Sequence, residues 1–148
     1  MIGYQYVTLR CVPRVEREEF VNVGVVVYAQ SVDFLESAHH VDEGRLRALA
    51  PDLDLGTVED MLCTVQAVCR GDSGRGLPHL EGLGRRFGWL TAPRSTIVQP
   101  SPRHGGLCHD PALELQRLMV LLVRPGPPGS DPPVSPAEQA GGPEPAGR

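Results

Sequence analysis

Histidine and cysteine are the residue types in this sequence that could bind a metal ion. His39 and His40 are adjacent, as are Cys108 and His109, and His104 lies close to the second pair. Adjacent side chains on extended backbone point to opposite faces, so neither pair can easily supply two ligands to one ion. The spacings also match no structural zinc pattern. The sequence therefore predicts no metal site, and it indicates no cofactor.

Nucleophilic catalysis has equally little support. Cys108 could be drawn as a thiol with His104 or His109 as its base, but closeness in sequence is not the geometry that such a pair needs. The chain contains no G-x-S-x-G nucleophile elbow. Cys63 and Cys69 would stand about 240° apart around a helix, which suits core thiols better than a redox pair. These patterns favour a protein that is not an enzyme.

One strand carries a more promising set of side chains. Residues 19–29 read EFVNVGVVVYA, in which Asn22 and Gly24 interrupt an apolar run. Read with period two, one face of this strand is uniformly apolar and is expected to pack on helices: Val21, Val23, Val25, Val27 and Ala29. The other face is expected to be polar with an aromatic residue at each end: Phe20, Asn22, Gly24, Val26 and Tyr28. Such a face, if uncovered, would be a natural surface for a homodimer.

Two interpretations of Asn22 and Gly24 are open. They can close a β-bulge and a polar network inside the hairpin. Alternatively, a ligand or partner sits on this face, with Arg10, Arg17 and Glu19 around it. Arginine there would favour a carboxylate or phosphate through its planar fork of donors, although Arg17 and Glu19 can also pair with each other.

Composition limits the classes of function. The net charge is −4 and all fourteen positive residues are arginine. A negative chain lacks the basic excess of a nucleic-acid-binding surface, so no nucleic-acid partner is expected. The absence of lysine excludes Schiff-base chemistry and the P-loop lysine. We read the bias toward arginine as the mark of a bacterial genome rich in G and C.

Neither a membrane nor an oxidising compartment is indicated. The longest apolar run, LMVLLV at 118–123, is far shorter than the roughly eighteen residues of a membrane-spanning helix. The first residues lack the charge and the apolar length of a signal peptide, and the four cysteines form no C-x-x-C pair. We therefore expect a soluble cytoplasmic protein with reduced thiols.

The elements that would position these residues form an α+β domain over residues 1–124. An N-terminal antiparallel meander is expected, with strands at 4–12, 19–29 and 31–38. Helices are expected at 42–51, 57–71, 77–90 and 110–123, with Asp42, Thr57 and Asp110 as N-caps and Gly71 as a terminator. A short strand is expected at 94–99, and RHGG at 103–106 is expected to be a turn. The predicted sheet has three to four strands, covered on one face by three or four helices.

Residues 125–148 are predicted to be a disordered tail. They hold eight of the fifteen prolines and no aromatic residue. Such a segment cannot bury enough apolar surface to offset the entropy of ordering it.

Three stretches together resemble a bacterial family, domain of unknown function 3037. They are YVTLRCVPRVEREEFVNVGVVVY, WLTAPRSTIVQPSPRHGGL and DPALELQRL, and the resemblance spans about residues 4–123. By position, the residues that match the family's N-terminal and C-terminal signatures are Arg10, Arg17, Glu19, Asn22, Gly24, Arg94, Ser95, Gly106 and Leu107. RHGGL departs from a more usual H-T-G-L. The resemblance implies no activity, but family members are often encoded beside HipA-like serine/threonine kinases, which suggests a partner role.

The sequence thus favours a non-catalytic interaction or accessory protein of the bacterial cytoplasm, with a HipA-like kinase as its partner. The alternative is an enzyme or sensor that acts on a small anionic ligand through Arg10, Arg17, Glu19 and Asn22. Arg94 and Ser95 complete the candidate ligand- or partner-binding set.

Overall fold

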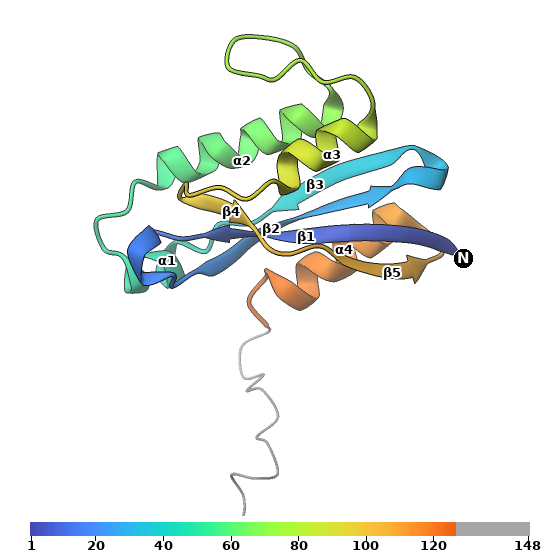
Figure 1. The fold of residues 1–148 in the computed structure, drawn as a ribbon. Coiled ribbons are helices and arrows are strands. Elements are labelled where there is room, and N and C mark those ends of the chain that lie inside the picture. The colour runs from blue at the N-terminus through green and yellow to red at the C-terminus, as the bar shows by residue number, and fades with distance from the viewer. Residues whose placement is uncertain (127–148) are drawn as a thin grey trace, which may run out of the picture.

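The sheet is built on the predicted N-terminal meander. In the computed structural model, which describes residues 1–126, β1 (Ile2–Cys11), β2 (Val21–Ala29) and β3 (Phe34–His39) are antiparallel neighbours. The free edge of β1 pairs with two further strands in succession, β5 (His104–Cys108) along Ile2–Tyr6 and β4 (Val98–Pro100) along Leu9–Cys11. Figure 1 shows this arrangement. The predicted α+β class and the antiparallel meander are confirmed, but the sheet has five strands and not three to four.

Strand β5 corrects the prediction of a turn at residues 103–106. Gly105 and Gly106 weaken the strand signal because glycine has low strand propensity. In the structure Gly106 lies opposite Tyr4, and a Cβ atom at Gly106 would come within 2.8 Å of the Tyr4 hydroxyl oxygen. The glycine is therefore required by a tertiary contact, which the local sequence does not reveal.

A β-bulge in β2 corrects the prediction of its two faces. Leu9 pairs with Gly24 and Arg10 pairs with Asn22, so Val23 is an extra residue in β2. Beyond the bulge, each side chain of β2 points to the face opposite to the one expected for a regular strand. As a result the predicted apolar face is divided between two cores: Val21 and Val23 pack in one, and Val25, Val27 and Ala29 pack in the other.

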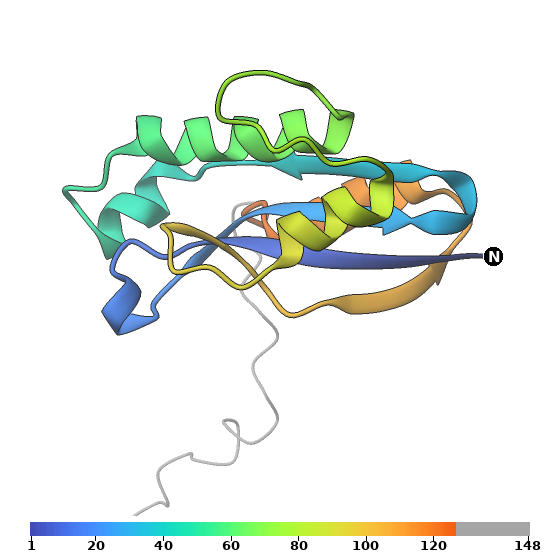
Figure 2. The same cartoon turned by 45° about the horizontal axis from the view of Figure 1, so that its top comes forward.

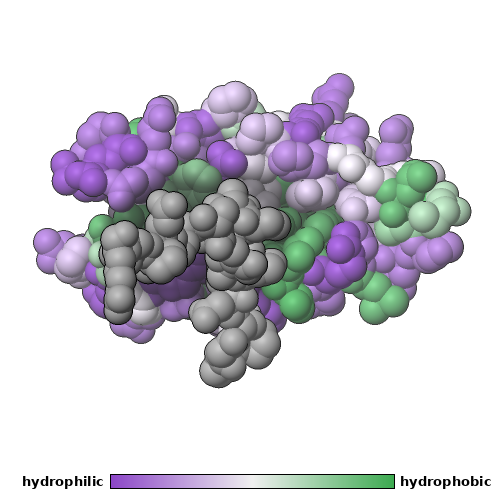
Figure 3. Space-filling model, turned by 90° about the horizontal axis from the view of Figure 1, so that it is seen from below, coloured by the Kyte–Doolittle hydropathy of each residue, from purple (hydrophilic) through white to green (hydrophobic). Residues whose placement is uncertain are grey.

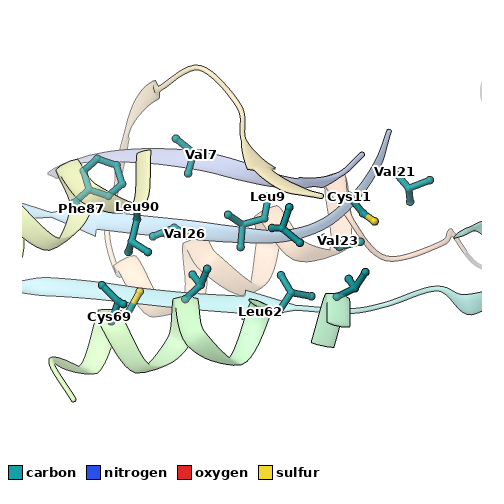
Figure 4. Packing of buried hydrophobic residues seen from close by; sticks show 14 of the residues in the cluster. Val7, Leu9, Cys11, Val21, Val23, Val26, Leu62, Cys69, Phe87 and Leu90 are labelled. Carbon is teal, nitrogen blue, oxygen red and sulfur yellow. The ribbon is translucent and has the colours of Figure 1, made fainter. Parts of the chain in front are cut away.

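Helices cover both faces of the sheet, and not one face as predicted. α1 (Glu43–Leu49), α2 (Leu55–Arg70) and α3 (Leu83–Thr91) pack on one face, where Figure 4 shows side chains of the sheet meeting those of α2 and α3. α4 (Pro111–Leu122) packs on the opposite face through Leu115, Leu118 and Met119. Figures 1 and 2 show the sheet between these two layers. The predicted polar face of β2 is therefore covered by the chain itself, because Asn22 contacts α4 whereas Val26 and Tyr28 pack on the side of α1 to α3.

Capping residues mark the starts of α1, α2 and α4, whereas α3 has no side-chain cap and begins at Leu83, six residues later than predicted. Asp42 and Asp110 accept backbone hydrogen bonds at the starts of α1 and α4, and Gly71 ends α2 with φ of 75°, as predicted. The predicted cap Thr57 is wrong, because Asp54 caps α2 and Thr57 donates its hydroxyl to that carboxylate. This hydrogen bond lowers the pKa of Asp54.

Short 3-10 turns, Val15–Arg17 and Gln30–Val32, lie in the two connections of the meander. No helix within residues 1–126 combines the length and apolar character that crossing a membrane requires. The predicted tail, apart from its first two residues, lies outside the described residues.

Candidate functional site

Arg10 and Asn22 are brought together on the two central strands, near the end of β1 and the start of β2. They are directly opposite in the paired strands β1 and β2, and Gln99 of β4 lies opposite Arg10 on its other side. Asn22 contacts α4. Arg10 lies on the same face of the sheet as Asn22, because its neighbours Leu9 and Cys11 pack in the core on the opposite face. A polar row therefore crosses three strands beside the C-terminal end of α4.

Asn22 joins the sheet to α4. Its Nδ2 donates to the carbonyl oxygen of Leu122 at 3.2 Å, which satisfies one of the carbonyls that a helix leaves free at its C-terminus. Its Oδ1 is buried and has no hydrogen-bond partner. The amide thus has a structural role in the predicted bulge region, although its partner is a helix end and not a backbone group of the bulge.

Arg10 is held by an aromatic ring. Its guanidinium carbon lies 4.3 Å from the centroid of Phe20, a residue that is 45% exposed. Its Nε is buried and has no hydrogen-bond partner. Phe20 precedes β2 and was predicted to lie at one end of the polar face. Its contact with Arg10 of the neighbouring strand was not predicted from the sequence.

Gly24 lies away from this polar row, on the other face. A Cβ atom there would be 2.8 Å from the carbonyl oxygen of Ala38 and 3.1 Å from Leu9 Cδ1. The glycine therefore allows β2 and β3 to approach closely, and it contributes nothing to a ligand site at Arg10.

Arg17 and Glu19 form an ion pair at the surface, with side chains that are 57% and 42% exposed. They line a shallow hollow between the β1–β2 connection and α1, together with Pro13, Arg14 and Leu49. Exposed ion pairs contribute little to stability. Because the guanidinium and the carboxylate bind each other, neither is an unoccupied charge aimed at a ligand.

Arg94 and Ser95 lie outside the polar row. Arg94 stacks on Trp89 of α3 with its guanidinium carbon 4.2 Å from the ring centroid, and it donates to the Trp89 carbonyl oxygen. Burial lowers the pKa of Arg94. Ser95 is exposed. Trp89 packs against the core on the α2 and α3 side, so this pair does not join Arg10.

The histidines and cysteines are separated by the fold. His39 Nε2 lies 3.5 Å from the Glu59 carboxylate of α2, and His104 stacks on Tyr6. In residues 1–126 no group of three or more metal-ligating side chains comes together. Burial raises the pKa of the Cys11 and Cys69 thiols to about 11, which disfavours the reactive thiolate.

The sequence interpretation missed the outward face of α4. Leu113, Val120 and Leu121 are 69%, 66% and 65% exposed. Spacings of seven and eight residues place them on one side of a helix. We call these three residues the α4 stripe. Figure 3 views the molecule from this side and shows hydrophobic surface among polar side chains.

Arg117 stands between the ends of the stripe. It binds the Glu114 carboxylate through Nε and Nη2, at 3.0 and 2.6 Å. The Arg117 side chain is 60% exposed, whereas that of Glu114 is only 12% exposed. The outer surface therefore presents the guanidinium and hides its carboxylate. The Arg117 hydrogen bonds lower the pKa of Glu114.

Tyr4 links β1 to the same carboxylate and predicts a loss of stability at alkaline pH. Its hydroxyl donates to Glu114 at 2.6 Å, and burial, with this hydrogen bond, raises the pKa of Tyr4 to about 12. A phenol with a raised pKa stabilises the fold fully below pH about 10, and this contribution is lost as the pH rises toward 12. We expect the free energy of unfolding to fall by about 2 to 3 kcal/mol over that range.

Urea unfolding at several alkaline pH values measures this effect, with Tyr4→Phe as the control. The variant should show a much smaller fall, because it has no phenol to ionise. An equal fall in both proteins would contradict the assignment to Tyr4.

Removal of the Asn22 amide should destabilise the fold. In Asn22→Ala the Leu122 carbonyl loses its side-chain donor, and we expect the free energy of unfolding to decrease by about 1 to 3 kcal/mol. Gln99→Ala is the matched control, because Gln99 is partly exposed and donates no side-chain hydrogen bond to a described residue. Its effect should stay within about 0.5 kcal/mol. An unchanged melting temperature in Asn22→Ala would instead favour a ligand-binding amide.

Comparison with known proteins places the chain in a family. A search of curated proteins and a search of solved structures each found no match. The model of a family described as a protein of unknown function, DUF3037, matches residues 6–123, most of the 148-residue chain. The match includes all four helices and the whole sheet except the first four residues of β1. The chain belongs to the DUF3037 family.

Proposed function

We propose that this chain is a non-catalytic interaction protein that binds a partner protein through the outward face of α4. The observation that carries the proposal is the exposure of the α4 stripe. A helix that packs on a sheet through one face normally carries polar residues on the other. About two thirds of each of these three large aliphatic side chains is exposed to water, which is unfavourable. A partner that covered them would gain the free energy of burying this apolar surface.

The position of Arg117 within the stripe favours a partner of a different kind over a second copy. Arg117 lies midway between Leu113 and Leu121. A two-fold pairing of α4 helices that buries the whole stripe on both copies is centred on Arg117, so two guanidinium groups would meet there. Each guanidinium is paired with Glu114 through Nε and Nη2, so this arrangement would bury two Nη1 groups against each other with no acceptor for either. The fitting partner is a surface with apolar side chains and an oxygen that accepts from Arg117 Nη1, which binds no described residue.

The other features of the chain agree with a binding role. The most distinctive polar residues form structural contacts: Asn22 with Leu122, Tyr4 with Glu114, and Arg94 with Trp89. The thiols with raised pKa are buried in the cores. These contacts support a rigid scaffold that presents α4.

The resemblance to DUF3037 suggests the identity of the partner. A HipA-like serine/threonine kinase in the bacterial cytoplasm is the partner that we propose, because members of the family are often encoded beside such kinases. Arg117 gives this proposal a structural requirement, which is an acceptor for Nη1 on the kinase surface that contacts α4.

Titration calorimetry with a purified HipA-like kinase of the source organism tests the proposal. We expect a complex, and we expect Leu113→Asp to weaken it at least about thirtyfold, the size of a hot-spot residue. An aspartate in the first turn of α4 agrees with the helix dipole, so this variant should remain folded. Val15→Asp is the control, because Val15 is an exposed aliphatic residue on the β1–β2 connection.

The contrary outcomes are distinct. Absence of a complex would overturn the kinase as partner. Equal affinities of Leu113→Asp and the unsubstituted protein would overturn the role of α4. A dimer of the chain alone, detected by light scattering and removed by Leu113→Asp, would replace the foreign partner by a second copy.

A further inference from the structure

Three arginines in the described part of the chain stack on aromatic rings, and one of them differs from the others. Arg94 lies over Trp89, Arg103 over Phe87 and Arg10 over Phe20; this is the complete set. Arg94 also donates to the Trp89 carbonyl oxygen, and Arg103 donates to the Thr91 hydroxyl at 2.7 and 3.1 Å. Arg10 has a ring but no acceptor among residues 1–126.

The missing acceptor matters because Arg10 is partly buried. Its Nε has lost water and gained no partner. A buried donor without an acceptor is unfavourable, and more so when the group is charged. Arg10 as a whole is partly exposed, and Nε is the only one of its guanidinium nitrogens that is both buried and without a partner, so the Nη edge is the part that a ligand would contact.

The neighbours of Arg10 leave its charge unneutralised. The residues opposite it on the two paired strands are Asn22 and Gln99, both neutral amides. No carboxylate of a described residue lies within 4.0 Å of the guanidinium, and Glu19 of the nearby connection is paired with Arg17. The guanidinium is therefore an oriented cation in an uncharged row.

We infer that Arg10 is the receptor of an oxyanion site, in which the Nη edge of the guanidinium binds a carboxylate or phosphate group. Phe20 holds the guanidinium in place, so little side-chain entropy is lost on binding. The planar fork offers two parallel donors to two oxygens of the ligand. Arg17 and Glu19, which bind each other, are outside the site, and Arg94 is on the other face of the sheet. This inference does not depend on the proposed partner.

Nuclear magnetic resonance of the arginine Nε–Hε groups tests the site directly in the full chain. Sodium phosphate and, separately, sodium acetate are titrated at constant ionic strength, with sodium chloride as the balancing salt. We expect a saturable shift of the Arg10 signal, assigned by its absence in Arg10→Gln. The signals of Arg94 and Arg103 are internal controls, because their hydrogen bonds are already made, and they should not saturate.

Saturation with phosphate alone identifies a phosphate site, and saturation with acetate alone identifies a carboxylate site. Saturation with both supports the shared oxyanion chemistry. Phe20→Leu should weaken binding, because the guanidinium loses its aromatic support. The inference is overturned if the Arg10 signal does not saturate with either anion, or if all three arginines shift equally, which would show general ionic association.

Discussion

Replacement of Gly24 by valine is expected to destabilise the protein by at least about 3 kcal/mol. A Cβ atom at this position would lie 2.8 Å from the carbonyl oxygen of Ala38 and 3.2 Å from the Cβ atom of His39. The nearest atom belongs to the backbone of β3 and cannot rotate away, so the two strands must separate. Urea unfolding followed by circular dichroism measures the loss.

Gly88→Ala is the control for this substitution. Gly88 lies inside α3, and a Cβ atom there would meet no atom within 4 Å. Alanine should stabilise the helix by about 0.5 to 1 kcal/mol. If Gly24→Val were as stable as the unsubstituted protein, the close approach of β2 and β3 would be wrong.

Phe87→Ala is expected to cost about 3 to 5 kcal/mol. Phe87 is 1% exposed, and its ring lies 4.9 Å from that of Tyr28, so it fills the space between α3 and the sheet. Its loss leaves a cavity and also removes the ring beneath the Arg103 guanidinium. The measurement is the free energy of unfolding in urea.

The same truncation at Phe20 shows how much of the loss depends on the burial of the ring and not on its being a phenylalanine. Phe20 is 45% exposed, so Phe20→Ala should cost about 1 kcal/mol or less. Equal losses at the two positions would contradict the assignment of Phe87 to the core and of Phe20 to the surface.

Local signals in the sequence predict much of the fold. The strands of the meander follow from β-branched and aromatic runs that end at turns. Asp42 and Asp110 predict where α1 and α4 begin, because capping chemistry is local. The sequence also indicated a bulge at Asn22 and Gly24, which the register of β1 and β2 confirms.

Other features depend on contacts that no local pattern encodes. The bulge inverts the alternation of β2, so a strict period of two assigned Val25 to the wrong face. β5 is a strand because it pairs with β1 and because Tyr4 covers Gly106. Helices on both faces follow from the return of the chain beneath the sheet after β5, which is a matter of topology.

The candidate site could be predicted only in part. The sequence placed Arg10 and Asn22 in one candidate site, and in the structure the two residues are partners in the pairing of β1 with β2. It could not show that Asn22 binds Leu122, one hundred residues away. A signal for the α4 stripe did exist, because a helix that is apolar on nearly all sides is not explained by one buried face.

We propose that the α4 stripe contacts a HipA-like kinase, and methyl cross-saturation from the kinase would detect this contact. In the complex, saturation of the kinase protons should reduce the methyl signals of Leu113, Val120 and Leu121, while the signals of Val15 and Val32 keep their intensity. Val15 and Val32 are also exposed and lie in the connections of the meander, so they report any transfer that is not specific. Loss of intensity at Val15 or Val32 with none at the stripe would contradict the claim.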